Sequence, residues 1–119
     1  MHDHEITRVG FIRNGDKGGS PDGLCGDKGL LEVKTALPAV LIETLIADRA
    51  PPEHAAQCQG NLWVAEREWI DLVVYWPKMP LFKKRIYRDE RYIADMRAAV
   101  KLFNEELDEL EAKVRKYAA

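Results

Sequence analysis

The sequence is poor in cysteine and has no long hydrophobic run, and each absence excludes a class of protein. Cys25 and Cys58 are the only cysteines among the 119 residues, and they lie far apart with no C-x-x-C partner. Neither a disulfide framework nor a cysteine-based zinc site is therefore expected. No apolar stretch approaches the ~20 residues that span a bilayer, and the N-terminus lacks a basic and then apolar signal segment. We expect a cytoplasmic protein with no membrane partner.

The length and composition are those of one ordinary globular domain. A chain of 119 residues can bury a single core but not two. Hydrophobic residues make up 46% of the chain and charged residues 32%, a balance that is typical of soluble globular proteins. We therefore predict one domain that spans residues 1–119.

The net charge of −2 argues against a nucleic-acid partner when taken alone, but the charges are unevenly distributed. Residues 78–91 include six basic residues and two acids, whereas residues 104–111 include five acids and no base. A local basic surface can bind a phosphate backbone even on a slightly acidic protein. The residues predicted to do so are Lys83, Lys84 and Arg85. Alternatively, these three residues solvate and protect an edge strand.

The chemically most informative pattern lies between residues 20 and 34. Asp22 stands in the stretch Ser-Pro-Asp-Gly-Leu-Cys, and Glu32-Val33-Lys34 follows after a Gly-rich turn. Side chains alternate across a strand, so Glu32 and Lys34 share one face while Leu31 and Val33 point to the other. Two neighbouring carboxylates repel each other unless a cation lies between them, and hard carboxylate oxygens suit Mg²⁺ or Mn²⁺.

This pattern suits the chemistry of phosphodiesters. Mg²⁺ usually keeps several waters and binds through one or two carboxylates plus a substrate phosphate. Lys34 beside such a metal would position or deprotonate the attacking water and stabilise charge on the phosphate. The alternative is a solvated Glu32–Lys34 pair with Asp22 shaping a turn. The occurrence of Pro21-Asp22-Gly23, the turn and an apolar strand in this order favours the catalytic interpretation.

The periodicity of apolar residues predicts strands alternating with helices, and hence an α/β fold with a mixed β-sheet flanked by helices. Pro51-Pro52 ends one predicted helix and the next begins there. The last helix carries apolar residues at alternating steps of three and four, which form a coiled-coil-like seam. This seam packs on the sheet of its own chain or, alternatively, contacts another subunit. The predicted strands are 5–13, 29–35, 69–76 and 81–88, and the predicted helices are 37–47, 53–66 and 89 to the end.

One glutamine in the helix predicted over 53–66 faces inward. Gln59 lies three residues before Leu62 and four before Trp63, so it shares their face, whereas Gln57 aligns with Asn61 and is expected to face water. An inward polar group needs a partner. Gln59 is therefore either a site residue or a core glutamine bonded to a backbone group.

These motifs together resemble a known family. The acid, turn and Glu32-Val33-Lys34 pattern resembles the PD-(D/E)XK nuclease motif, and residues 20–25 resemble the matching stretch of lambda-type phage exonucleases and YqaJ-like viral recombinases. Gln57-Cys58-Gln59, followed by Trp63-Val64, resembles the Gln-x-Gln helix of that family. Residues 86–92 resemble its last strand and final helix. The resemblance extends from about residue 20 to the C-terminal helix.

The resemblance implies a restriction-endonuclease-like core and a Mg²⁺- or Mn²⁺-dependent DNA exonuclease that digests linear double-stranded DNA from an end. It implies that Asp22, Glu32 and the Val33 carbonyl bind the metal. Lys34, helped by Gln59, would orient the attacking water. By the same resemblance Ser20 contacts a DNA phosphate, the partners are a single-strand annealing protein and two further copies in a trimer, and the setting is a phage or prophage in a bacterial host.

The sequence departs from the family at its front. Lambda-type enzymes begin with a helical region that carries a further active-site glutamate and an arginine for the 5′-phosphate, and nothing upstream of Asp22 matches either residue. Three explanations stay open: a fragment or truncated gene, a partner that supplies the missing part, or a chain that binds metal and DNA but cuts poorly. The alternative functions are accordingly a non-catalytic DNA-binding or assembly module, or an endonuclease on the same core.

Overall fold

The computed structural model describes residues 6–7, 10, 12–14 and 17–118, and the statements below refer to these residues. The chain divides into two compact units, Met1–Arg88 and Asp89–Ala119, and each unit is described by itself. The single domain expected over residues 1–119 stays a prediction.

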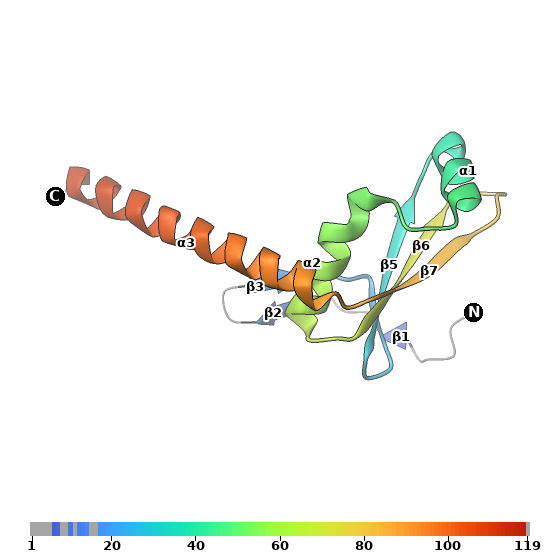
Figure 1. Ribbon diagram of the computed structural model, residues 1–119, viewed down its shortest axis with the longest axis horizontal. Helices are drawn as coiled ribbons and strands as arrows, with labels where there is room; N and C mark the ends of the chain where they lie inside the picture. Colours follow the sequence, from blue (N-terminus) through green and yellow to red (C-terminus); the bar gives the residue numbers. More distant parts are fainter. Residues whose placement is uncertain (1–5, 8–9, 11, 15–16, 119) are drawn as a thin grey trace. The chain divides into compact units, whose positions relative to one another are not determined.

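A five-stranded mixed sheet forms the centre of the first unit, in the order β1-β4-β5-β6-β7 (Figure 1). The pair β5–β6 is parallel, and the pairs β1–β4, β4–β5 and β6–β7 are antiparallel. A separate antiparallel pair is formed by β2 and β3. The strands are β1 (Ile6–Thr7), β2 (Ile12–Asn14), β3 (Lys17–Gly19), β4 (Gly23–Cys25), β5 (Gly29–Thr35), β6 (Trp69–Tyr75) and β7 (Phe82–Tyr87).

Two helices connect the parallel strands and cover one face of the sheet. A parallel pair requires a crossover connection, and here α1 (Pro38–Ala47), the 3₁₀ turn η1 (Pro52–His54) and α2 (Ala55–Ala65) supply it. Proline begins both α1 and η1, as expected where a first-turn N–H has no partner to lose. The hydrophobic core lies between these helices and the sheet. It contains Leu30, Leu41, Cys58, Leu62, Ile70, Leu72, Val74 and Phe82.

The opposite face of the sheet carries an ion pair stacked on an aromatic ring. Arg85 of β7 donates two hydrogen bonds to the fully buried Asp71 of β6, at 2.9 and 3.2 Å. The Arg85 guanidinium also lies 3.6 Å from the centre of the Trp69 ring. A Cβ atom at Gly29 would lie 2.1 Å from that ring, so only glycine fits beneath it. We call Trp69, Asp71, Lys83 and Arg85 the Asp71 cluster.

The second unit consists of one long helix, α3 (Glu90–Ala118). Asp89 caps it, because its Oδ1 accepts a hydrogen bond of 3.0 Å from the Tyr92 N–H. Charged residues surround an apolar seam, whose side chains are exposed from Phe103 onward. In the part of the chain that the structure describes, no helix is both long and apolar enough to cross a membrane.

The predicted mixed sheet, its flanking helices and the long C-terminal helix are confirmed. The strand predicted over 29–35 has those bounds, and the other elements from residue 37 onward differ by a few residues at most. The single strand predicted over 5–13 is wrong, because β1 and β2 occupy its two ends in different sheets. The apolar alternation there is loose, and Gly10, which has no side chain to pack, interrupts it.

Candidate active site

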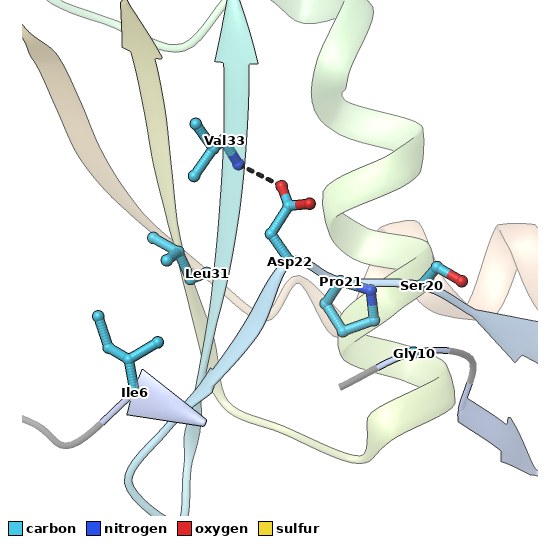
Figure 2. A pocket seen from close by; sticks show the side chains of 7 residues that line it. All are labelled: Ile6, Gly10, Ser20, Pro21, Asp22, Leu31 and Val33. Atoms are coloured by element: carbon cyan, nitrogen blue, oxygen red, sulfur yellow. Dashed lines mark hydrogen bonds between the residues drawn. The ribbon is translucent and has the colours of Figure 1, made fainter. Parts of the chain in front are cut away.

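Asp22 is the residue just before β4, and its side chain extends into the site. The β4–β5 register brings the two acids together, since Gly23 pairs with Leu31 and the Asp22 N–H donates to the Leu31 carbonyl at 3.0 Å. The Asp22 carboxylate then accepts a hydrogen bond of 2.7 Å from the Val33 N–H, as Figure 2 shows. Asp22 is thereby fixed beside the peptide group that joins Glu32 to Val33.

Glu32 and Lys34 share the sheet face that α1 and α2 cover, as the strand period predicts. The Lys34 amine lies 3.5 Å from Glu32 Oε1, and the Glu32 side chain is only 4% exposed against 28% for Lys34. The Lys34 amine thus faces the Glu32 carboxylate, while the Lys34 side chain stays partly exposed to solvent. The structure brings Asp22, Glu32 and Lys34 to one place.

Two amide side chains of α2 hold Glu32 from the helix side. Asn61 donates to Glu32 Oε2 at 3.3 Å, and Gln57 donates to Glu32 Oε1 at 3.4 Å. Gln57 is exposed, as predicted, and its amide also contacts Glu32, a contact that the sequence analysis did not foresee. The face that these two residues share lies beside Glu32 of β5, with Asn61 buried and Gln57 at the solvent-exposed edge. Their spacing of four residues was the available signal, since two amides one turn apart can meet one carboxylate.

Gln59 is buried, as its spacing predicts, with 6% of its surface exposed. Its amide nitrogen donates to the Tyr87 carbonyl at 3.1 Å. This contact matches the backbone-bonded alternative for Gln59 and ties α2 to the end of β7. Direct participation of Gln59 in catalysis stays a prediction.

Burial of the Glu32 carboxyl group raises its pKa above the ordinary value of 4.5, and the nearby Asp22 carboxylate raises it further. The Lys34 amine acts in the opposite direction, but burial and Asp22 dominate. In the absence of a cation, therefore, the Asp22 carboxylate disfavours ionisation of Glu32. A bound cation would remove this conflict.

The donor set around Val33 fits a hard divalent cation. The N–H and C=O of one strand residue point to the same side, so the Val33 carbonyl faces the side where Asp22 lies. Two carboxylates and one carbonyl are oxygen ligands of the kind that Mg²⁺ and Mn²⁺ prefer. The described residues contain no group of three or more His, Cys, Asp or Glu side chains that could hold a metal. A site with open positions for water and substrate, rather than a closed structural site, is what this set can form.

A pocket with a volume of about 590 Å³ adjoins Asp22 on its other side (Figure 2). Ser20, predicted to contact a DNA phosphate, is exposed at its edge. Asp22 therefore contributes both to the pocket and to the acid pair. The pocket is lined by Ile6, Gly10, Ser20, Pro21, Asp22, Leu31 and Val33.

The three basic residues predicted to form one surface are divided between the two faces of the sheet. Lys83 and Arg85 lie in the Asp71 cluster, 3.9 and 2.9 Å from the Asp71 carboxylate. Lys84 lies on the opposite face and pairs with Asp48 at 3.1 Å. The side chains of consecutive strand residues point to opposite faces of the sheet, so three adjacent basic residues in a strand do not form one surface. A single DNA-binding surface formed by these three side chains is not what the structure shows.

The raised pKa of Glu32 predicts that Glu32→Gln stabilises the metal-free protein near neutral pH. As pH rises from 4.5 to the folded-state pKa, the folded state binds more protons than the unfolded state, so stability falls. We expect a gain in the free energy of unfolding at about pH 8, which disappears near pH 4, where the carboxyl is already protonated. Urea unfolding in EDTA across this range measures the difference. A gain that is the same at both pH values would contradict the assignment.

Comparisons with known proteins agree with this geometry. Residues 10–68 match the model of the YqaJ-like viral recombinase domain. The crystal structure of an alkaline exonuclease from Laribacter hongkongensis, LHK-Exo, is similar with a TM-score of 0.87 and 36% identity, covering 97% of this chain and 63% of that chain. LHK-Exo in complex with dAMP matches with the same values. No curated protein matches the sequence.

The chain thus spans 63% of the length of the exonuclease it resembles. The match covers nearly all of the chain described here, including β5 and α2, which carry Glu32, Lys34 and the amides that hold Glu32. It confirms the restriction-endonuclease-like fold that the resemblance implied. Residues 10–68 of this chain thus carry a YqaJ-like viral recombinase domain, on the fold of an alkaline exonuclease.

Proposed function

We propose that this chain is a metal-dependent deoxyribonuclease, an exonuclease of the phage-recombination type that hydrolyses linear double-stranded DNA. One observation carries the proposal: Asp22, Glu32 and Lys34 meet around the Val33 peptide. The exonuclease activity named for the Laribacter hongkongensis protein supports it, because that protein is 36% identical and has the same fold. Its complex with dAMP fits an enzyme that releases mononucleotides.

Each residue of the site has a role in this proposal. Asp22, Glu32 and the Val33 carbonyl would hold Mg²⁺ or Mn²⁺. When bound, the ion would polarise the scissile phosphate and stabilise the leaving oxygen. The Lys34 amine lies at the same place. There it orients or deprotonates the attacking water and stabilises the charge that develops on the phosphate.

The surrounding residues position these groups and the DNA. Asn61 and Gln57 donate to both oxygens of Glu32 and so restrict its rotation toward the metal position. Ser20, which lines the pocket beside Asp22, would donate its hydroxyl to a phosphate of the bound strand. Double-stranded DNA is the proposed partner, and the proposals of an annealing protein and a trimeric ring rest on the family resemblance alone.

A second candidate is a DNA-binding or assembly module that retains the nuclease core but cuts poorly. The observation in its favour is the exposed apolar seam of α3, a surface that suits assembly.

A cleavage assay with the complete chain separates these candidates. Linear duplex with and without a 5′-phosphate and closed circular duplex are incubated with Mg²⁺, with Mn²⁺ or with EDTA. Release of mononucleotides from linear DNA only, and only with metal, is the expected result. Cutting of circles would indicate an endonuclease, and DNA affinity without any cutting would indicate the module.

A further inference from the structure

The exposed part of α3 carries a regular heptad pattern. Apolar residues repeat at steps of three and four, and from Phe103 onward they are 50–97% exposed. In heptad terms, Val100, Leu107 and Val114 take the a positions, and Phe103, Leu110 and Tyr117 take the d positions. An a/d seam of this length is the surface that another helix covers in a coiled coil.

The charges that flank the seam distinguish between helix orientations. In a parallel pair, a g residue faces the e residue five positions later on the other helix, which would place Glu106 against Glu111 on both sides. Two such contacts between like charges disfavour the parallel arrangement. In an antiparallel pair, g faces g, and Glu106 of one copy can meet Lys113 of the other.

We propose that α3 pairs with the same helix of a second copy in an antiparallel coiled coil over residues 100–117. In one register all six seam residues are matched, Leu107 with Leu110, Phe103 with Val114 and Val100 with Tyr117. The same register joins Glu106 to Lys113 twice. Shifting the register by one heptad brings either Glu106 or Lys113 against its own copy and leaves seam residues uncovered.

This pairing uses the second unit alone. Glu111 stays in its intrahelical pair with Arg115, one turn away, and in the proposed register it faces Asn104 rather than another acid. The contact has two-fold symmetry, since each copy presents the same surface. It goes beyond the proposed nuclease function and does not depend on it, because no residue of the Asp22 site takes part.

Disulfide trapping on the complete chain tests both the contact and its orientation. The native thiols do not interfere, because Cys25 and Cys58 are buried and burial raises the pKa of Cys58 to about 11. A Phe103→Cys chain and a Val114→Cys chain that carries a mass tag are oxidised separately and mixed. The proposal expects a crosslink between the two variants in the mixture and little within either variant alone. Crosslinks within each variant would indicate a parallel pair and overturn it.

Charge reversal gives a second, independent readout by sedimentation equilibrium. Lys113→Glu is expected to weaken self-association by about 10-fold, and adding Glu106→Lys to it should restore most of the loss. Lys116→Glu makes the same change in net charge at an outward c position, and it should alter the dissociation constant by less than about 2-fold. A wild-type chain that stays monomeric at high concentration, or equal effects of both reversals, would overturn the proposal.

Discussion

Replacing Lys34 with alanine is expected to lower the rate of DNA cleavage by about 10²–10⁴-fold, the range typical of losing a general base or a preorganised donor. The amine lies 3.5 Å from Glu32 Oε1 and is 28% exposed, so it reaches the place where water and phosphate would meet. Its removal leaves the two carboxylates and their backbone contacts in place. The loss should therefore appear in the chemical step, with DNA binding and metal affinity changed much less.

The rate is measured under single-turnover conditions on 5′-phosphorylated linear duplex, which isolates the chemical step from product release. Lys28→Ala is the matched control, because Lys28 is exposed at the far end of β5 and pairs only loosely with Glu68, at 3.9 Å. This variant should retain wild-type activity within about 2-fold. A Lys34→Ala protein that folds normally and cuts at the wild-type rate would exclude Lys34 from the mechanism.

Arg85→Ala is expected to reduce the free energy of unfolding by about 2–4 kcal/mol. The substitution removes both Arg85 hydrogen bonds from Asp71, which has zero exposure, and leaves the Lys83 amine 3.9 Å away. Removing one partner of a buried pair is costly because the other charge stays desolvated. Since Arg85 itself is 35% exposed, the loss should fall below that of a fully buried pair. Loss of the guanidinium stacked on Trp69 adds a smaller contribution.

The neighbouring residue on the same strand provides the control. Lys84 pairs with Asp48, whose side chain is 80% exposed, so Lys84→Ala should cost less than about 1 kcal/mol. Urea unfolding monitored by tryptophan fluorescence measures both variants, and an unchanged slope would show that the transition itself is the same. Equal losses for the two substitutions would contradict the importance of burial. The Arg85 variant should also change the emission of Trp69.

The sequence was sufficient to predict the parts of the fold and site that depend on local periodicity. The strand over 29–35 follows from its apolar alternation, and the same alternation places Glu32 and Lys34 on one face. The Gly-rich turn between the acids is local too, and the β4–β5 hairpin it predicts brings Asp22 to Val33.

The parts that could not be predicted depend on which element covers which surface. The spacing of Gln57 and Asn61 defines a helix face but not the strand beneath it, so their contact with Glu32 needed the packing of α2 on the sheet. Likewise, a run of three basic residues looks continuous in the sequence although a strand divides it between two faces. Asp71, the acidic partner of Arg85, lies 14 residues earlier in the sequence, within a strand that is otherwise apolar.

Because the Val33 N–H must donate to Asp22, the site tolerates an inserted residue at some positions of the β4–β5 hairpin and not at others. One extra residue within β5 before Glu32 would move every β5 residue that precedes the insertion to the opposite face of the sheet. The β4–β5 pairing that brings Asp22 beside Val33 would then be lost. An extra residue at the tip of the hairpin, around residues 26–28, would leave that match intact. Natural variation in length among related chains should therefore accumulate at this tip and be absent between Leu31 and Lys34.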